Sequence, residues 1–560
     1  MKKQAIISTL WGFVLLLLAA CSNENTNTAV ADTEVNVAQK VAFKVDFADY
    51  NADEELNGTR AAANKVLGEQ NVELPNGLRA EVAIRRDTTR QTSEARTAAT
   101  RALADDTYTM LAYDASGVLK AELTGRVSAG VFSVQSGGMR LKVGDTYTLV
   151  CYNSKVTRNG NKLVVTQANA GTALVGRTTY TVPATPYYQT VNFTLKHVAA
   201  RIRIKLVGWM EVPATNATLT TTQAVPAATE YDAITGAATV TGNASVTTQL
   251  TFPASTEAQY TANAYTSLSN EYSYFLPTTD VSKLRLTFSG GQIYKTYAMT
   301  GARLTLTPKQ TLTLDANGSY LITVTLAYNF LYLMSNGDIG TYHDTTFGGG
   351  TKTPVGIVVS RGKKIAMALQ QAGNNAYVKW YAGSNWNVAY NKVMPNSISQ
   401  VIATTNGYEA TWDPATNTPA AGTTPKGDNL TMFPPFYYAG HYGEELAAKG
   451  IPATGTLAGK KWYLPANGEL ANLYTMLTLG ETFPAIGFSY TMYNAMLTNA
   501  MGQVGGVKYF SIWTSVQHLS VYFPGNLSRS PTASFGGNQA YLYSDRATYN
   551  ESHILAFIKY

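Results

Sequence analysis

The stretch QTVNFTLKHVAARIRIKLVG, residues 189–208, alternates apolar and polar side chains over most of its length. A period of two places successive side chains on opposite faces of a β-strand, so this stretch predicts strand structure. The same pattern recurs on both sides of it, in TYTLVCYN at 146–153 and in SYLITVTLAYNFLYL at 319–333. Turn pairs such as Asn159-Gly160 separate the strands. Short strands divided by many turns predict β-sandwich domains.

Two alternating segments near the start of the chain each present one apolar face. VAFKVDF at 41–47 alternates strictly, and LRAEVAI at 78–84 repeats the pattern, so both segments predict strands. Between residues 85 and 101 the sequence is rich in Arg, Thr and Ala. A nucleic-acid-binding stripe would carry interleaved aromatic side chains or a fold signature, and this segment has neither. We therefore expect a solvated, protease-accessible segment and no nucleic-acid partner.

After about residue 331, helical periodicity appears among the strands. Leu470, Leu473 and Leu477 recur at helical spacing in NGELANLYTML, and Gly480 is expected to end that helix. MYNAMLTNAMG at 492–502 repeats the pattern. Further strand patterns follow both helices, so the last third of the chain is predicted to be α+β.

The stretch GKKWYLPANGELANLY, residues 459–474, looks like a site because it gathers aromatic side chains, a proline and an acid. Trp462 and Leu464 fit the core side of a strand. Asn467 is a favourable N-cap, and Glu469 then falls in the first helical turn, where a carboxylate meets the positive end of the helix dipole. A structural role for Glu469 is favoured over catalysis.

The composition bounds the class of protein. The chain has 560 residues, of which 45% are hydrophobic and 14% charged, and this is typical of a globular protein of two to four domains. It contains no Gly-x-Ser-x-Gly or His-Glu-x-x-His motif, and its five histidines lie too far apart for a local metal motif. We expect no enzyme activity, catalytic residue, metal or cofactor, although paired glycosidase carboxylates could still assemble from distant loops.

The N-terminus carries the most specific short signal. Two lysines precede an apolar run that ends in small residues before Cys21, which predicts a secretory signal over residues 1–20. The sequence Leu-Ala-Ala-Cys at its end resembles a bacterial lipobox. That resemblance implies cleavage between Ala20 and Cys21 and acylation of Cys21, whereas the alternative is a plain signal peptide. Acylation would leave Cys151 as the other of two cysteines, without a disulfide partner and buried in a strand.

Three features together resemble the fimbrillin superfamily of Bacteroidales, the subunits of lipoprotein-derived pili. The first is the lipobox followed by the strand at 41–47 and by an arginine in LNGTRAAA. The second is the pair of strands in DDTYTMLAYDASGVL and GDTYTLVCYNS. The third is a Phe-x-Leu-x-His-x-x-Ala-Arg-hydrophobic signature at Phe193, Leu195, His197, Ala200, Arg201 and Ile202. The resemblance covers roughly residues 1–330 and implies a lipidated tether with a pro-strand at 21–60, then β-sandwich domains at 61–190 and 191–330.

Residues 331–560 resemble a C-type-lectin-like domain found in bacterial surface proteins. The likeness rests on the order of TPVGIVVSRGKKIAMAL, GKKWYLPANGELANLY, MYNAMLTNAMGQVGG, YFSIWTSVQ and ILAFIKY. Thr514 stands where the family has a first Ser, and the final strand carries Ile558-Lys559-Tyr560 where an Arg is usual. The calcium-dependent sugar triplets are absent, so no calcium-bridged sugar site is implied.

The resemblances imply a mostly β precursor of a fimbrium subunit at the cell surface, anchored by lipid in the outer membrane until it is processed. In the family a protease cuts after an Arg and removes the N-terminal strand, and the vacated groove accepts a strand from the next fimbrial subunit. Arg60 is the expected cut site and Arg101 the alternative. The residues SHILAFIKY at 552–560 are expected to close the last domain and not to act as a free donor strand, which implies a tip position.

An adhesive role at the tip implies a receptor on a host or bacterial surface, either a glycan or a protein. Two other interpretations stay open. The chain could be a stalk or anchor subunit of a pilus, or a surface glycan-binding lipoprotein or glycoside hydrolase outside any pilus.

Overall fold

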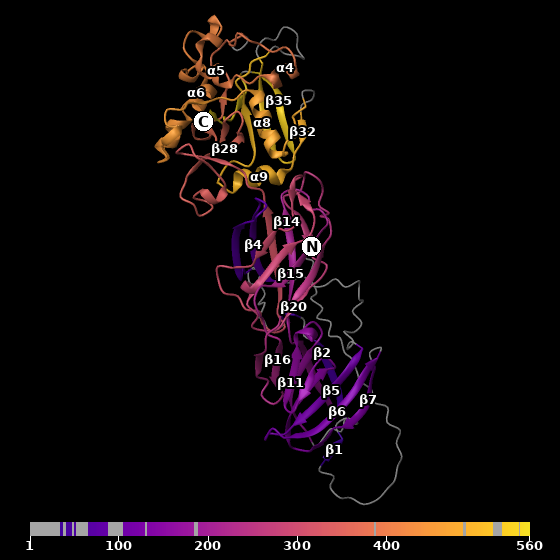
Figure 1. The fold of residues 1–560 in the computed structure, drawn as a ribbon. Helices are drawn as coiled ribbons and strands as arrows, with labels where there is room; N and C mark the ends of the chain where they lie inside the picture. The colour runs from indigo at the N-terminus through magenta and orange to yellow at the C-terminus, as the bar shows by residue number, and fades with distance from the viewer. Residues whose placement is uncertain are drawn as a thin grey trace, which may run out of the picture.

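The computed structural model describes residues 34–36, 41–47, 50–51, 65–87, 105–128, 131–183, 189–385, 388–484, 489–518, 529–547 and 549–560. These residues form three bodies arranged in a row (Figure 1). Strands dominate the first and second bodies, and helices join strands in the third. The mostly β fold class predicted from the sequence is confirmed.

A seven-stranded sheet forms the first body. Its strands, in spatial order, are β2 (Val41–Phe47), β13 (Gln189–His197), β12 (Leu174–Thr181), β9 (Thr146–Asn153), β5 (Asp106–Tyr113), β6 (Leu119–Ser128) and β7 (Val131–Gly138). A short pair, β1 (Glu34–Asn36) and β8 (Arg140–Lys142), accompanies it. β2 runs parallel to β13, and the other neighbours in the sheet are antiparallel.

Apolar clusters cover both faces of this sheet. Val150 belongs to one cluster and Cys151 to the other, as the alternation of side chains along a strand requires. Cys151 is a buried free cysteine, as predicted. Burial raises the pKa of its thiol to about 12, so the thiolate needed for reaction is scarce at neutral pH.

A small sheet joins the first body to the second. Its strands are β10 (Thr157–Asn159), β11 (Lys162–Thr166), β16 (Ala228–Asp232) and β17 (Ala238–Thr241). β11 pairs antiparallel with β16, although the two strands are separated by more than sixty residues of chain. Main-chain hydrogen bonds thus tie the two bodies together, and Ala233 and Leu276 of the second body pack into a cluster of the first.

The second body is a sandwich of two sheets. One contains β3 (Gly68–Glu73), β4 (Arg79–Arg86), β25 (Ser319–Ala327), β14 (Ala200–Gly208) and β19 (Tyr265–Leu268), with β20 (Ser273–Phe275) also paired to β14. The other contains β18 (Thr247–Phe252), β15 (Thr215–Thr221), β21 (Leu284–Phe288) and β24 (Arg303–Thr305). A hairpin of β22 (Gln292–Ile293) and β23 (Tyr297–Ala298) lies between elements of the second sheet in sequence. Side chains from both sheets share one core.

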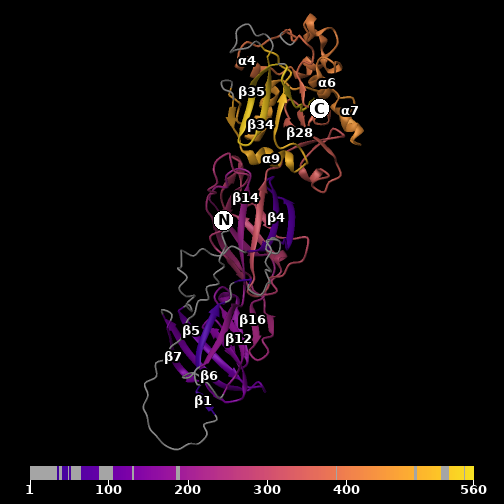
Figure 2. The same cartoon turned by 180° about the vertical axis from the view of Figure 1, so that it is seen from behind.

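The sheets do not divide at the predicted boundary between 61–190 and 191–330. β3 and β4 pair into the second body, where Figures 1 and 2 show β4 close to β14, whereas β13 completes the first. The apolar face predicted for 78–84 is buried, but against strands more than two hundred residues away. Alternation identifies the buried face of a strand and not its partner, so the sequence pattern could not place this hairpin.

The third body contains two larger sheets. One has the order β27 (Ile339–Gly340), β26 (Tyr332–Met334), β28 (Pro354–Ser360), β29 (Ile365–Ala368), β37 (Phe557–Lys559) and β31 (Trp462–Tyr463). The other has the order β32 (Ser489–Thr491), β35 (Gln539–Ala547), β34 (Arg529–Gly536) and β33 (Phe510–Trp513). A short pair joins β30 (Val378–Lys379) to β36 (Glu551–Ser552).

Most helices lie in the third body. The α-helical segments are α3 (Ala372–Asn375), α4 (Ile398–Ala403), α5 (Gly407–Trp412), α6 (Pro434–Gly440), α7 (Tyr442–Ala448), α8 (Asn467–Leu477) and α9 (Asn494–Gly502). The 3₁₀ helices are Gln167–Asn169, Val281–Lys283, Tyr342–Asp344, Pro414–Thr416, Pro419–Ala421, Lys426–Asp428 and Gly455–Leu457. None of the helices in the described part of the chain is both long enough and apolar enough to span a membrane.

The structure confirms a helix where the sequence predicts α8, with two corrections at its ends. Ala466, not Asn467, is the extended residue before the helix, and the Asn467 side chain instead accepts a hydrogen bond from the Thr514 hydroxyl at 2.7 Å. The helix ends at Leu477, before Gly480. Leu479 already has a φ of 55°, so the chain turns away one residue before the predicted glycine.

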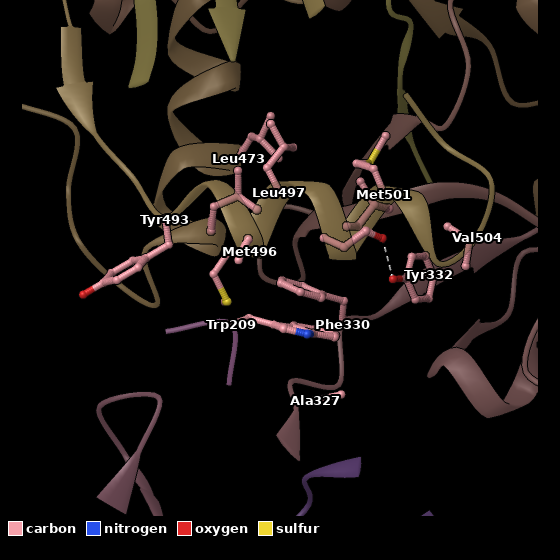
Figure 3. Packing of buried hydrophobic residues seen from close by; sticks show 14 of the residues in the cluster. Trp209, Ala327, Phe330, Tyr332, Leu473, Tyr493, Met496, Leu497, Met501 and Val504 are labelled. Atoms are coloured by element: carbon pink, nitrogen blue, oxygen red, sulfur yellow. Dashed lines mark hydrogen bonds between the residues drawn. The ribbon is translucent and has the colours of Figure 1, made fainter. Parts of the chain in front are cut away.

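The second and third bodies share one continuous core, shown in Figure 3. Trp209 stacks on Phe330 with 6.1 Å between ring centroids, and Met496 of α9 points toward the Trp209 ring. The Tyr332 hydroxyl donates a hydrogen bond of 2.6 Å to the Ala500 carbonyl of the same helix. This packing joins the two bodies through buried side chains in addition to the chain that links them.

Candidate strand-binding site

β2 lies at one edge of the seven-stranded sheet and is the main backbone partner of β13. The two strands run parallel in continuous register, with 41–47 opposite 189–195. On its other side β13 pairs with β12 only through Lys196 and His197, among the residues that the structure describes. Without β2, the N–H and C=O groups along most of β13 would form an open sheet edge, which is a template for another strand.

The same edge offers an apolar surface. Val191 and Leu195 of β13 are buried in the core of the first body, whereas Thr194 is exposed. Gly176 of β12 permits the two strands to approach closely, because a Cβ there would lie 2.7 Å from the Leu195 side chain and from the Thr194 carbonyl oxygen. A strand at this edge can therefore be held by backbone hydrogen bonds and by alternate apolar side chains.

The Phe-x-Leu-x-His-x-x-Ala-Arg signature spans the end of β13 and the start of β14. Its buried core residues are Leu195, Ala200 and Ile202. His197 and Arg201 lie at the junction of the first two bodies, and both contact the ring of Tyr50. The His197 and Tyr50 rings stack with 4.2 Å between centroids and an interplanar angle of 8°. The Arg201 guanidinium carbon lies 4.0 Å from the Tyr50 ring centroid.

Asn51 fixes the chain that leaves β2 to the second body. Its backbone N–H donates to the Asn317 carbonyl at 2.8 Å, and its side-chain oxygen accepts from the Ser319 N–H at 2.8 Å. Its side-chain amide donates to the Asp87 carbonyl at 3.1 Å. Asn51 has a φ of 64°, a left-handed conformation that asparagine tolerates better than most residues. These bonds hold Asn51 against the second body.

The contacts of Tyr50 with the described residues are made by its ring and not by its hydroxyl. The hydroxyl oxygen is buried and has no hydrogen-bond partner among the described residues. Burial raises the pKa of Tyr50 above its ordinary value, so the phenol stays neutral. The ring contacts with His197 and Arg201 therefore account for its position.

The site residues predicted from the sequence fall in parts of the chain that the structure does not describe. Ala20, Cys21, Arg60 and Arg101 lie outside the described residues, as does the side chain of Phe193. In sequence, Arg60 falls between Asn51 and β3, and Arg101 falls between β4 and β5. Sequence reasoning missed Tyr50 and Asn51 altogether. The one available signal was the Phe-x-Leu-x-His-x-x-Ala-Arg signature, because it contains the two residues that contact Tyr50.

Glu469 has the structural role predicted for it. It is 1% exposed, and its carboxylate accepts hydrogen bonds of 2.8 Å from the Ala466 N–H and from the Tyr463 hydroxyl. Burial raises the pKa of Glu469 to about 7. The carboxyl is used to cap α8 and brace the preceding strand. Elsewhere in the described part of the chain, no three His, Cys, Asp or Glu residues gather in a way that would hold a metal ion.

The final strand is a second element that bears on assembly. β37 is the last of the six strands of its sheet in sequence order. In space it lies between β29 and β31 and pairs antiparallel with both. Residues 554–558 are fully buried. For residues 557–559, the sequence prediction that 552–560 pairs within the last domain is thus confirmed.

Comparison with known proteins identifies a fimbrillin-like segment. The model of the fimbrillin-like family matches residues 166–336, which cover the second body apart from β3 and β4, the strands β12 and β13 of the first body, and the first strand of the third. A search of the curated proteins found no match. Residues 166–336 are therefore similar to the fimbrillin-like family, and this segment includes β13.

Three solved structures with some likeness to the chain are described as fimbrial or cell adhesion proteins of Bacteroides and Porphyromonas. A putative cell adhesion protein from Bacteroides ovatus is 15% identical, with a TM-score of 0.28, covering 45% of this chain and 86% of that one. A fimbrial protein from the same species is 12% identical, with a TM-score of 0.26, covering 81% and 94%. The fimbrial anchor protein Mfa2 from Porphyromonas gingivalis is 12% identical, with a TM-score of 0.21, covering 39% and 79%. Likenesses at such low TM-scores do not support an assignment of function.

Proposed function

We propose that this protein is a non-enzymatic subunit of a bacterial fimbrium that joins its neighbour by strand exchange at β13. The observation that carries the proposal is the pairing of β13. Seven of its residues pair with β2, and only two pair with β12, among the described residues. β2 precedes the expected cut site at Arg60, so cleavage there would leave it held by non-covalent contacts alone.

Strand exchange at this edge follows the physics of β-augmentation. An incoming strand would restore the backbone hydrogen bonds of residues 189–195 and would cover the apolar surface around Val191 and Leu195. The match of the fimbrillin-like family model over residues 166–336 supports the proposal, because that segment contains the strand that would accept the donor.

The fold favours Arg60 over Arg101 as the processing site. A cut at Arg60 would separate β1, β2 and the Tyr50–Asn51 segment from the rest of the chain. A cut at Arg101 would also separate β3 and β4. The residues of 78–84 that face the core of the second body are 0–4% exposed, and each large apolar side chain lost from a core costs about 1.5–3 kcal/mol. Release of β3 and β4 would therefore open that core, whereas release of β2 exposes an edge.

The same cut would free the folded bodies from the membrane. In the proposed precursor, the signal sequence is removed between Ala20 and Cys21, and acylated Cys21 anchors the chain in the outer membrane. Arg60 lies between this anchor and β3, so after the cut the folded bodies would be held to the anchored segment by non-covalent contacts alone. Departure of β2 would then detach them and expose β13. The protein would then reach the cell surface as part of a fimbrium.

A tip position is supported by the final strand. β37 pairs on both sides and its residues are buried, so donating it to a neighbour would dismantle the third body. We therefore propose that this subunit accepts a strand and does not give this one away. The third body, proposed to be lectin-like, would then face outward and contact a glycan or protein receptor. A stalk or anchor position is the competing assignment.

A reversible disulfide bond that holds β2 on β13 tests this proposal. Asp46 and Thr194 are register partners in β2 and β13, and the spacing of paired strands, about 4.8 Å, suits a disulfide. The double variant Asp46→Cys/Thr194→Cys should not enter fimbriae when oxidised and should enter them after reduction. The single variant Asp46→Cys is the control and should assemble in both conditions. Equal assembly of the oxidised double variant would exclude strand exchange at this edge.

A further inference from the structure

We propose that His197 and Arg201 form a binding pocket for an aromatic ring, which holds Tyr50 in the precursor and takes an aromatic side chain of the neighbouring subunit in the assembled fimbrium. The inference rests on the proposed strand exchange, because the pocket becomes vacant only when the segment before Arg60 leaves. It goes further by naming a side-chain class and a position that the incoming strand must carry. The pocket lies at the junction of the first two bodies, beyond the end of the β13 edge.

The walls of the pocket are held by contacts that do not involve Tyr50. The Arg201 side chain donates from Nε to the Ser319 hydroxyl at 2.8 Å, and its guanidinium carbon lies 4.3 Å from the Tyr272 ring centroid. The His197 backbone N–H donates to the Asn317 side-chain oxygen at 3.3 Å. Because these partners remain after Tyr50 departs, the pocket is preorganised for a second ring, and preorganisation lowers the cost of binding.

The chemistry of the pocket selects a ring. A guanidinium above a ring face and a stacked imidazole both favour aromatic over aliphatic side chains. The Tyr50 hydroxyl has no partner among the described residues, so phenylalanine should serve as well as tyrosine. The occupant is therefore defined as an aromatic side chain, with no requirement for a phenol.

The position of the pocket fixes the register of the strand. Tyr50 follows Phe47, the last residue of β2 paired with β13, by three positions. A shift of one residue would turn every side chain of the strand to the opposite face, so a correct register matters for the whole apolar surface. A ring that fits the pocket only when the preceding strand is correctly aligned would specify that register. A neighbour's strand should accordingly carry an aromatic residue about three positions after its last paired residue.

The experiment measures peptide exchange on the nicked full-length protein. A recognition sequence for a site-specific protease is inserted between residues 55 and 56, and the purified chain is cut there. Fluorescent peptides with the sequence of residues 41–51 then compete with the resident fragment. The peptide carrying Tyr50→Phe should bind within about twofold of the unchanged peptide, and the peptide carrying Tyr50→Ala should bind about tenfold more weakly or worse.

A matched pair of protein variants assigns the effect to the pocket. Arg201→Ala should reduce the preference for the aromatic peptide over the Tyr50→Ala peptide to within about threefold. Arg203→Ala, on the same strand, should keep the full preference, because the contacts of Arg203 are with Tyr272 and Ser269 and the cation–ring contact with Tyr50 is made by Arg201. The Arg203 guanidinium carbon lies 5.1 Å from the Tyr272 ring centroid, and its Nε donates to the Ser269 carbonyl at 2.7 Å. The peptide substitutions leave the protein unchanged, so their result does not depend on how the variants fold.

The outcomes separate the two proposals. If no peptide exchanges with the resident fragment, strand exchange at β13 fails and the pocket fails with it. If all peptides exchange with equal affinity, strand exchange stands and the aromatic pocket is refuted. If the aromatic preference survives Arg201→Ala, the pocket has been assigned to the wrong residues.

Discussion

Replacement of Phe557 by alanine should destabilise the third body. It should not change which strands of this subunit can pair with a neighbouring fimbrial subunit. Phe557 is fully buried in β37, where its backbone pairs with both β29 and β31 and its ring lies 6.4 Å from that of Tyr463. Truncation of a buried phenylalanine to alanine costs about 3–5 kcal/mol. In a domain of 150–250 residues each kcal/mol lowers Tm by about 2–4 °C, so a decrease of about 6–20 °C is expected.

Differential scanning calorimetry of the purified full-length protein measures this shift, with Lys559→Ala as the matched control. Lys559 is on the same strand, and its ion pair with Glu409 is 3.4 Å long and exposed on both sides. Such pairs contribute about 0–1 kcal/mol, so the control should change Tm by less than about 4 °C. If Phe557→Ala keeps the wild-type Tm but no longer enters fimbriae, β37 acts as a donor strand and the tip assignment is refuted.

Three further predictions address the anchor, the cap of α8 and the joint between the second and third bodies. Cys21→Ala should be exported without acylation, and radiolabelled palmitate entering this variant would contradict the lipobox interpretation. Burial raises the pKa of Glu469 from its ordinary value of 4.5 to about 7. Between these pH values the folded state keeps a proton that the unfolded state has lost, so stability should fall as the pH rises. Glu469→Gln should flatten this pH dependence of Tm in thermal melts. Trp209→Ala removes a ring that is 4% exposed; it should cost about 3–5 kcal/mol and separate the unfolding of the two bodies in calorimetry, whereas Val240→Ala, at a side chain 38% exposed, should leave the transitions unchanged.

Strand and helix patterns in the sequence identified local structure and buried faces. The alternation in VAFKVDF and LRAEVAI matches strands β2 and β4, and the apolar face of 78–84 is buried as expected. The periodicity of NGELANLYTML matches α8. In each case the side-chain period is a local property, so a single segment contains the information needed to recognise it.

The partners of those strands depend on contacts between distant segments, and alternation does not encode them. β4 pairs with β25 in the second body, and β2 pairs in parallel with β13. The positions of Tyr50 and Asn51 were equally out of reach, because neither belongs to a periodic segment. His197 and Arg201 were singled out through a family signature, but only their contacts with Tyr50 in the structure suggest what they do.

The central claim is that β2 leaves β13 before the subunit joins a fimbrium, and the N-terminal sequence of the subunit in purified fimbriae tests it most directly. Edman sequencing or peptide mass spectrometry of the assembled protein should show a chain that begins at Ala61, with no peptide from residues 41–51. A chain that begins at Ala102 would assign processing to Arg101 and would require β3 and β4 to be released as well. A subunit in assembled fimbriae that still begins at Cys21 would contradict strand exchange at this edge.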